Sequence, residues 1–168
     1  MEILPDTAKT PATPDAYGVV GHPISHSRSP FIHGLFARQT QQALVYRSYD
    51  VTAEALDTFV REFFEQGKGL NITMPHKQAA AGLAGALTPR AARAGAVNTL
   101  SKSGQMIVGD NTDGAGLVRD LSFNLGITVQ QSSVLILGAG GATRGILAPL
   151  LALRPRSVVI ANRTPEHA

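Results

Sequence analysis

The stretch VLILGAGGATRGILAPLLALRPRSVVIAN, residues 134–162, decides the fold class. Its first apolar run predicts a buried strand, a glycine-rich turn and a helix follow, and the second apolar run predicts another strand. A strand, a glycine turn, a helix and a strand in this order form the opening βαβ unit of a dinucleotide-binding fold. Thr143 stands where the G-x-G-x-x-G pattern has its third glycine, so a plain strand–helix turn remains the alternative.

The glycine turn and the end of the second strand are predicted to bind a dinucleotide. Gly138 permits the sharp turn, Gly140 lets the backbone approach a pyrophosphate, and the helix N-terminus supplies free N–H groups. No acid follows the second strand to hold the ribose hydroxyls of NAD, and Arg163 can meet a 2′-phosphate, which favours NADP. A surface arginine at a strand end is the simpler account of Arg163. The predicted cofactor-binding residues are Gly138, Ala139, Gly140, Gly141, Ala142, Thr143, Asn162, Arg163 and Thr164.

Strand-like and helix-like segments also alternate upstream of this unit. Ser29 is expected to cap the first helix, with Pro30 at its first position. We predict strands at 17–21, 44–51, 69–74, 96–101 and 105–109, and helices at 29–40, 53–66, 76–86, 89–94 and 112–125.

This alternation predicts an α/β protein with two domains. An N-terminal substrate domain with a mixed sheet is expected at 16–115, after a flexible extension at 1–15. A linker helix region at 116–130 leads into the start of a Rossmann-type NADP-binding domain at 131–168.

The composition excludes several classes of protein. The chain has 168 residues, 43% hydrophobic and 16% charged, so it can form a real core, and it has no cysteine for a disulfide scaffold or a thiol nucleophile. The net charge of +3 comes from scattered Lys and Arg, which favours a small anionic ligand, or no special partner, over nucleic acid. No apolar run of about 18 residues and no secretory signal is present, so a cytoplasmic protein without a membrane span is expected. The histidines lack metal-ligand spacing, and no metal is predicted.

Four polar stretches stand at strand ends or in loops. GHPISHSRSP carries Ser27 and Ser29, whose hydroxyls can both face one carboxylate, although capping alone would explain Ser29. GAVNT carries Asn98, which in an apolar strand is either a structural bridge or a ligand contact.

The other two stretches hold the charged candidates. NITMPHK places Asn71 and Thr73 on one face of a strand with Lys77 just beyond them, although a solvated lysine is the alternative. GDNTDG carries Asp110 and Asp113, and helix capping is the simpler account of Asp110.

Taken together, these motifs resemble the shikimate dehydrogenase family from about Tyr17 to the end of the chain. The matching strings are GHPISHSRSPFIH, GLNITMPHK, AGAVNT, GDNTDG, GAGGATRG and NRT, and their order and spacing make the match specific. The resemblance implies the reversible reduction of 3-dehydroshikimate to shikimate by NADPH, on the route to chorismate and the aromatic amino acids.

The resemblance also implies a role for each motif. Lys77 would act with Asp113 as the catalytic pair, with Lys77 protonated beside the carboxylate so that it donates a proton in ketone reduction. The turn at 138–143 would hold the cofactor phosphates, and residues 162–164 would hold the 2′-phosphate. Ser27 and Ser29 would bind the substrate carboxylate, and Asn71, Thr73, Asn98 and Asp113 would hold ring hydroxyls.

Two departures from the family pattern leave alternatives open. His167 stands where many relatives have a second basic residue, so the NADP preference is expected to be softer. The chain stops at Ala168, where relatives continue, so residues 133–168 are expected to be poorly ordered alone, or to lean on a neighbouring chain, and to bind cofactor weakly. A quinate/shikimate dehydrogenase with looser specificity, or a non-catalytic fragment that binds shikimate-like acids, are the other hypotheses. Because relatives include monomers and dimers, a homodimer stays open.

Overall fold

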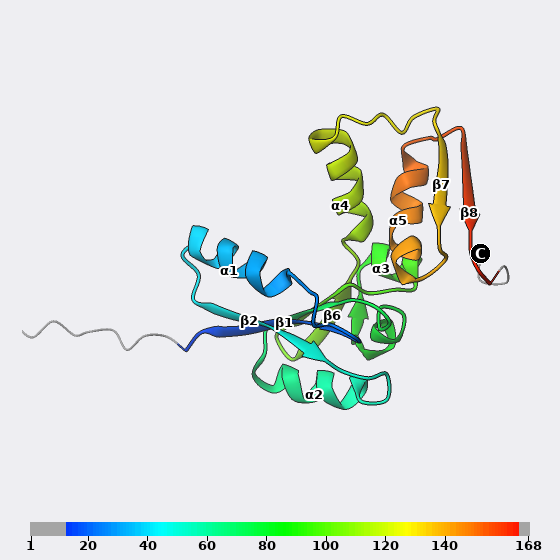
Figure 1. Cartoon of the computed structure of the whole chain (residues 1–168). Helices are drawn as coiled ribbons and strands as arrows, with labels where there is room; N and C mark the ends of the chain where they lie inside the picture. The colour runs from blue at the N-terminus through cyan, green and yellow to red at the C-terminus, as the bar shows by residue number, and fades with distance from the viewer. Residues whose placement is uncertain (1–12, 165–168) are drawn as a thin grey trace, which may run out of the picture.

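The computed structural model describes residues 13–164 (Figure 1). Two α/β units follow one another along the chain, one around a six-stranded sheet and one around a two-stranded sheet. The extension expected at 1–15 lies outside the described residues up to residue 12, and the first strand already begins at Asp15. His167 also lies outside them.

The larger sheet is mixed, which confirms the predicted fold class. Its strand order is β2-β1-β3-β5-β6-β4. β1 pairs in parallel with β2 and β3, whereas β5 runs antiparallel to both β3 and β6. The strands are β1 (Asp15–Gly21), β2 (Leu44–Asp50), β3 (Gly69–Ile72), β4 (Ala86–Leu87), β5 (Thr99–Ser103) and β6 (Met106–Asp110).

Two helices cover opposite faces of this sheet, α1 (Ser29–Gln39) and α2 (Leu56–Gln66) (Figure 1). α2 buries Leu56, Val60 and Phe64 at helical spacing against the core of the sheet. Burying these three side chains stabilises the domain by roughly 1.5–3 kcal/mol each.

The predicted cap of α1 was wrong. The N-cap position is Arg28, without a side-chain cap, and Ser29 is already helical. The backbone N–H of Ser29 donates instead to Ser27 Oγ at 3.3 Å. The hydroxyl of Ser29 is therefore not used to cap the helix.

The helix predicted at 76–86 was also wrong. The chain forms only a short 3₁₀ helix, η1 (Ala79–Leu83), and then β4, whose Ala86 pairs with Val108 of β6. Alanine has a high helix propensity, but pairing with a strand some twenty residues away overrides this local preference. The next helix, α3 (Pro89–Ala94), begins as predicted, with Thr88 Oγ1 accepting a hydrogen bond from the Ala91 N–H.

The smaller unit contains β7 (Ser133–Leu137), α5 (Gly141–Ala152) and β8 (Ser157–Ala161), and its two strands are parallel. This is the βαβ unit predicted from the glycine turn. α4 (Asp113–Arg119), which continues into the π-helical segment η2 (Asp120–Asn124), packs against α5. The expectation that residues 133–168 are poorly ordered on their own stays a prediction. No helix within residues 13–164 has the length and apolarity needed to cross a membrane.

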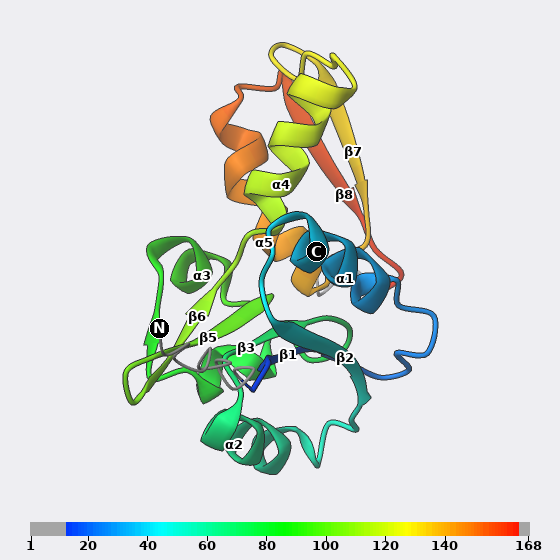
Figure 2. The same cartoon turned by 90° about the vertical axis from the view of Figure 1, so that its left-hand side faces the viewer.

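Close contact between α4 and α5 sets how the two units meet (Figure 2). A Cβ added to Gly114 of α4 would lie 2.6 Å from the carbonyl oxygen of Gly145 in α5. A Cβ on Gly145 would lie 2.6 Å from Asn111 Oδ1. Glycine is therefore required at both positions, and it brings the start of α4 directly against α5.

Candidate active site

A lysine and a carboxylate from distant loops meet where the two units join. Lys77 lies just beyond β3, and Asp113 is the first residue of α4. Lys77 Nζ donates a hydrogen bond to Asp113 Oδ2 at 2.6 Å, and the two side chains are only 16% and 21% exposed. Because this pair is largely shielded from water, its charges interact more strongly than they would on the surface.

The side chain of Asn98 orients Asp113. Its Nδ2 donates to Asp113 Oδ1 at 2.9 Å and to Thr112 Oγ1 at 2.8 Å. Its Oδ1 accepts from the Thr112 backbone N–H at 3.0 Å and from the Thr99 hydroxyl at 2.9 Å. All four hydrogen-bonding positions of the amide are thus used within the protein, so a ligand contact would have to replace one of these bonds. The structural bridge is the role that the structure shows directly.

Asn111, which the sequence analysis did not single out, holds the backbone of Asp113 in place. It is 3% exposed, donates to the Ala96 carbonyl at 2.9 Å and accepts from the Asp113 backbone N–H at 3.1 Å. It therefore fixes the first residue of α4 in position. Its place between two acids at a helix start is the signal that sequence reasoning could have used.

Asp110 does not cap α4, contrary to the account considered above. Its carboxylate accepts from Thr88 Oγ1 at 2.6 Å, from the Asn111 N–H at 2.7 Å and from the guanidinium of Arg90. The hydrogen bond from Arg90, then those from Thr88 and Asn111, hold the pKa of Asp110 at about 2, below its ordinary 3.8, although partial burial opposes this. Asp110 therefore joins β6 to the start of α3, outside the Lys77–Asp113 pair.

Of the remaining substrate candidates, Asn71 lies along the same network. Asn71 of β3 accepts a hydrogen bond from the Tyr46 hydroxyl at 2.7 Å and donates to Thr99 Oγ1 at 3.3 Å. Within the described residues, one N–H and one lone pair of its amide have no partner and could meet a ligand. The hydroxyl of Ser27 accepts a hydrogen bond from the Ser29 backbone N–H, its one partner among the bonds found in residues 13–164.

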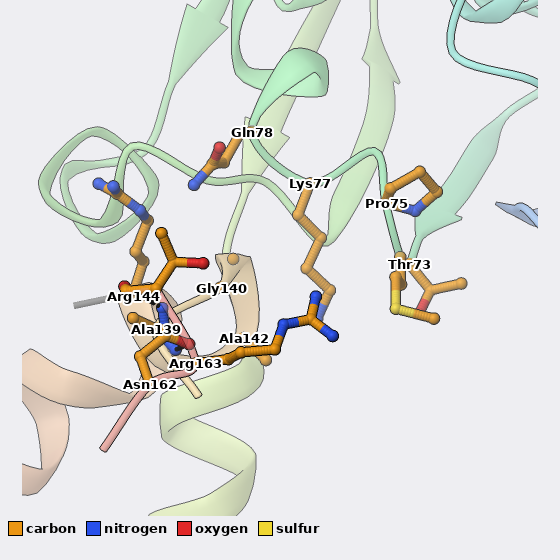
Figure 3. A pocket seen from close by; sticks show the side chains of 13 residues that line it. Thr73, Pro75, Lys77, Gln78, Ala139, Gly140, Ala142, Arg144, Asn162 and Arg163 are labelled. Atoms are coloured by element: carbon orange, nitrogen blue, oxygen red, sulfur yellow. Dashed lines mark hydrogen bonds between the residues drawn. The ribbon is translucent and has the colours of Figure 1, made fainter. Parts of the chain in front are cut away.

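The Lys77 side of this network opens into a cavity of about 740 Å³ between the two units (Figure 3). Thr73 and Lys77 line it from the larger unit, and the glycine turn and residues 162–164 line it from the smaller one. A Cβ on Gly140 would meet no atom within 4 Å, so the backbone there faces open space that a phosphate could approach. A Cβ on Gly141 would lie 3.0 Å from the Lys77 side chain, which shows how near the turn is to the pair.

Most of the predicted cofactor residues line this cavity, but Gly138 and Thr143 do not. Gly138 has a φ of +102°, and the Thr143 hydroxyl donates to its carbonyl at 2.7 Å. Thr143, at the position of the third glycine, thus stabilises the turn by a hydrogen bond to its first residue. Asn162 links the turn to the end of β8, since its Oδ1 accepts from the Ala139 N–H at 3.3 Å and its Nδ2 donates to the Thr164 carbonyl at 2.7 Å.

The cavity suits an anionic ligand. Lys77, Arg144 and Arg163 line it, and no acidic residue does among the described part of the chain. In Figure 3 the side chain of Arg163 extends toward the Lys77 side chain, whereas the side chain of Arg144 extends in the direction of Gln78. Arg144 was not identified from the sequence, because on a helical pattern it looks like any exposed basic residue. Within residues 13–164 no group of three or more His, Asp or Glu side chains is placed to hold a metal ion.

Comparison with known proteins places these features in a family. Residues 19–100 match the model of the shikimate dehydrogenase substrate binding domain. A shikimate dehydrogenase (NADP(+)) from Methylococcus capsulatus is 58% identical over 157 residues, and the match covers 92% of this chain and 56% of that protein. The chain thus spans little more than half the length of this relative.

Solved structures show the same arrangement. The shikimate dehydrogenase of Aquifex aeolicus superposes with a TM-score of 0.86 at 32% identity, covering 93% of this chain and 58% of that one. Shikimate 5-dehydrogenase from Thermus thermophilus in complex with NADP(H) and shikimate superposes with a TM-score of 0.84 at 34% identity, covering 92% and 58%.

Proposed function

Because this chain belongs to the shikimate dehydrogenase family, we propose that the protein catalyses the reversible, NADPH-dependent reduction of 3-dehydroshikimate to shikimate, a step toward chorismate and the aromatic amino acids. The observation that carries the proposal is the shielded Lys77–Asp113 pair beside the cavity of the glycine turn. Residues 16–115 would form the substrate domain, 116–130 the linker and 131–168 the start of the NADP-binding domain.

Lys77 is the proposed proton donor. Ketone reduction requires a proton at the oxygen of the carbon that receives hydride. The Asp113 carboxylate, 2.6 Å from the Lys77 ammonium nitrogen, holds the direction of the lysine side chain. In the reverse reaction Lys77 would accept the proton of the ring hydroxyl. NADPH, when bound, supplies the hydride.

The polar network is proposed to bind shikimate, a ring that carries a carboxylate and hydroxyl groups. The hydroxyls of Ser27 and Ser29 would bind its carboxylate, with Ser29 free of the helix cap. Asn71 can offer its spare N–H and lone pair to ring hydroxyls, and Thr73 lines the cavity beside Lys77. Asn98 would act chiefly by holding Asp113, because its amide is already saturated.

The cavity residues fit NADP. Residues 139–142 line the cavity at the start of α5, where a pyrophosphate is favoured, and Asn162, Arg163 and Thr164 would surround the 2′-phosphate. Gly138 and Thr143 would shape the turn without touching the cofactor.

Initial rates with shikimate and NADP⁺, compared with quinate and NAD⁺, test the proposal on the complete gene product that contains this chain. We expect turnover with shikimate and NADP⁺, and a marked preference for both. Comparable rates with quinate would support the looser quinate/shikimate enzyme instead. Absence of turnover in single-turnover absorbance at the NADPH band, with shikimate still bound, would support a non-catalytic protein that binds shikimate-like acids.

The partners in this proposal are the small acid and NADP, with no nucleic acid and no membrane. We place the reaction in the cytoplasm, where diffusible NADPH is available, and cell fractionation tests this location. Light scattering on the purified protein decides between a monomer and a homodimer.

A further inference from the structure

A continuous chain of side-chain hydrogen bonds runs across the larger sheet to the Lys77–Asp113 pair. It starts at Tyr46 on β2, passes through β3 and β5, and ends at the first residue of α4. The successive bonds are Tyr46 Oη to Asn71 Oδ1 at 2.7 Å, Asn71 Nδ2 to Thr99 Oγ1 at 3.3 Å, Thr99 Oγ1 to Asn98 Oδ1 at 2.9 Å, and Asn98 Nδ2 to Asp113 Oδ1 at 2.9 Å.

The direction of the bonds near Asp113 follows from one backbone group. The N–H of Thr112 can only donate, so the Asn98 atom that it meets must be the oxygen, and the Asn98 amide nitrogen must face Asp113. The Thr99 hydroxyl lies against that same oxygen and has a single proton, which it must therefore donate to Asn98.

The same reasoning fixes the rest of the chain. Because the proton of Thr99 is committed, its oxygen has to accept from Asn71, whose amide nitrogen must point toward Thr99. The oxygen of Asn71 then faces Tyr46, and the phenol has to be the donor. Every donor in the chain thus points toward the Asp113 carboxylate, an arrangement in which the bonds polarise one another.

The surroundings of Tyr46 suit a permanent donor. Its ring lies against that of His33, with centroids 4.0 Å apart. Burial raises the pKa of Tyr46 well above its ordinary 10, and a hydrogen bond with Ser29 acts in the opposite direction. The phenol therefore keeps its proton across the working range of pH. Ser29, one of the two residues proposed for the substrate carboxylate, is thus a near neighbour of the phenol.

We propose that Tyr46 is a positioning residue of the substrate site: its hydroxyl orients the Asn71 amide toward the ring and begins the donor chain that holds Asp113 in place. This role rests on the proposed function, since it assigns the free N–H and lone pair of Asn71 to the ring hydroxyls of shikimate. The residue acts through Asn71 and Asp113, not through direct chemistry.

The test is Tyr46→Phe in the complete gene product, with Tyr49→Phe as the matched control. Tyr49 is on the same strand, packs against Phe59 and Phe63, and makes no side-chain hydrogen bond to any residue in the described range. Losing one hydrogen bond of this kind changes an equilibrium by about 3- to 10-fold. We therefore expect Tyr46→Phe to raise the KM for shikimate by about that factor, with the KM for NADP⁺ within twofold of wild type, and Tyr49→Phe to change neither.

A second pair of variants separates positioning from folding. Thr99→Val breaks the chain one step further along, whereas Thr99→Ser keeps the hydroxyl. We expect Thr99→Val to raise the KM for shikimate as Tyr46→Phe does, Thr99→Ser to stay near wild type, and the double variant Tyr46→Phe/Thr99→Val to be little worse than Thr99→Val alone.

The outcomes distinguish this role from the function on which it rests. The positioning role alone is overturned if the wild type is active and Tyr46→Phe leaves the KM for shikimate unchanged. It is also overturned if Tyr46→Phe raises the KM for NADP⁺ in parallel with that for shikimate. An equal rise in the KM for shikimate in Thr99→Ser and Thr99→Val also overturns the positioning role alone. Wild-type protein that neither turns over shikimate nor binds it in calorimetry overturns the proposed function and the positioning role together.

Discussion

Replacing Gly145 with alanine should destabilise the packing of α5 against Asn111, which holds the backbone of Asp113 in the candidate site. The new Cβ would lie 2.6 Å from Oδ1 and 2.8 Å from Nδ2 of Asn111, well inside van der Waals contact. Asn111 is almost fully buried and cannot move without straining or losing its bonds to the Ala96 carbonyl and the Asp113 N–H. The substitution therefore acts on the first turn of α4 and on the carboxylate that it presents.

The size of the effect follows from these contacts. Overpacking a tight site costs about 1–3 kcal/mol. Each of the two hydrogen bonds of Asn111 contributes about 1 kcal/mol. Alanine inside a helix recovers about 1 kcal/mol relative to glycine. The free energy of unfolding should thus fall by about 2–4 kcal/mol, and shikimate turnover should fall with it because Asp113 is no longer held.

Gly116→Ala is the matched control for this experiment. Gly116 lies in α4, is exposed, and an added Cβ would meet no atom within 4 Å. This variant should be unchanged or slightly more stable, because alanine is the better helix former. Urea unfolding followed by circular dichroism compares the two variants with wild type. If Gly145→Ala is as stable as Gly116→Ala, the close packing of α5 on Asn111 is not what holds the site.

Three further changes probe other parts of the site. Lys77→Ala should abolish turnover while NADP⁺ affinity in calorimetry stays nearly intact, and a variant that keeps about a tenth of the wild-type rate would exclude Lys77 as the proton donor. Arg163→Gln should raise the KM for NADP⁺ while that for NAD⁺ is unaffected, and an equal change for both would remove the 2′-phosphate role. Asp110, with its pKa depressed to about 2 chiefly by Arg90, should stabilise the fold fully above pH 4 and lose that contribution as the pH falls toward 2. Thermal melts of wild type and Asp110→Asn should therefore converge in acid, and a constant difference down to pH 2 would contradict this.

Local patterns predicted much of the fold. The strands that became β1, β7 and β8 contain short apolar runs, and the glycine turn between β7 and α5 was recognisable from its flanks alone. The helix predicted for the Ala-rich stretch at 76–86 was wrong because the end of this stretch pairs with β6, which follows later in the chain. Propensity describes a residue and its near neighbours, whereas strand pairing depends on segments that only folding brings together.

The site divides in the same way. Lys77, Asp113, Asn98 and the glycine turn stand in motifs that can be recognised in the sequence, because their residue types are unusual at strand ends. Tyr46 gave no such signal, since a tyrosine in a strand is ordinary.

By itself, the amino-acid sequence determined the alternation of strands and helices, the position of the glycine turn between β7 and α5, and which polar residues stand in the loops. Tertiary structure alone decided that β2, β1, β3 and β5 lie in that order, so that side chains far apart in the chain form one line of donors ending on Asp113. The reason is geometric: a hydrogen bond acts over about 3 Å, and only the packed sheet brings residues from four segments within that distance.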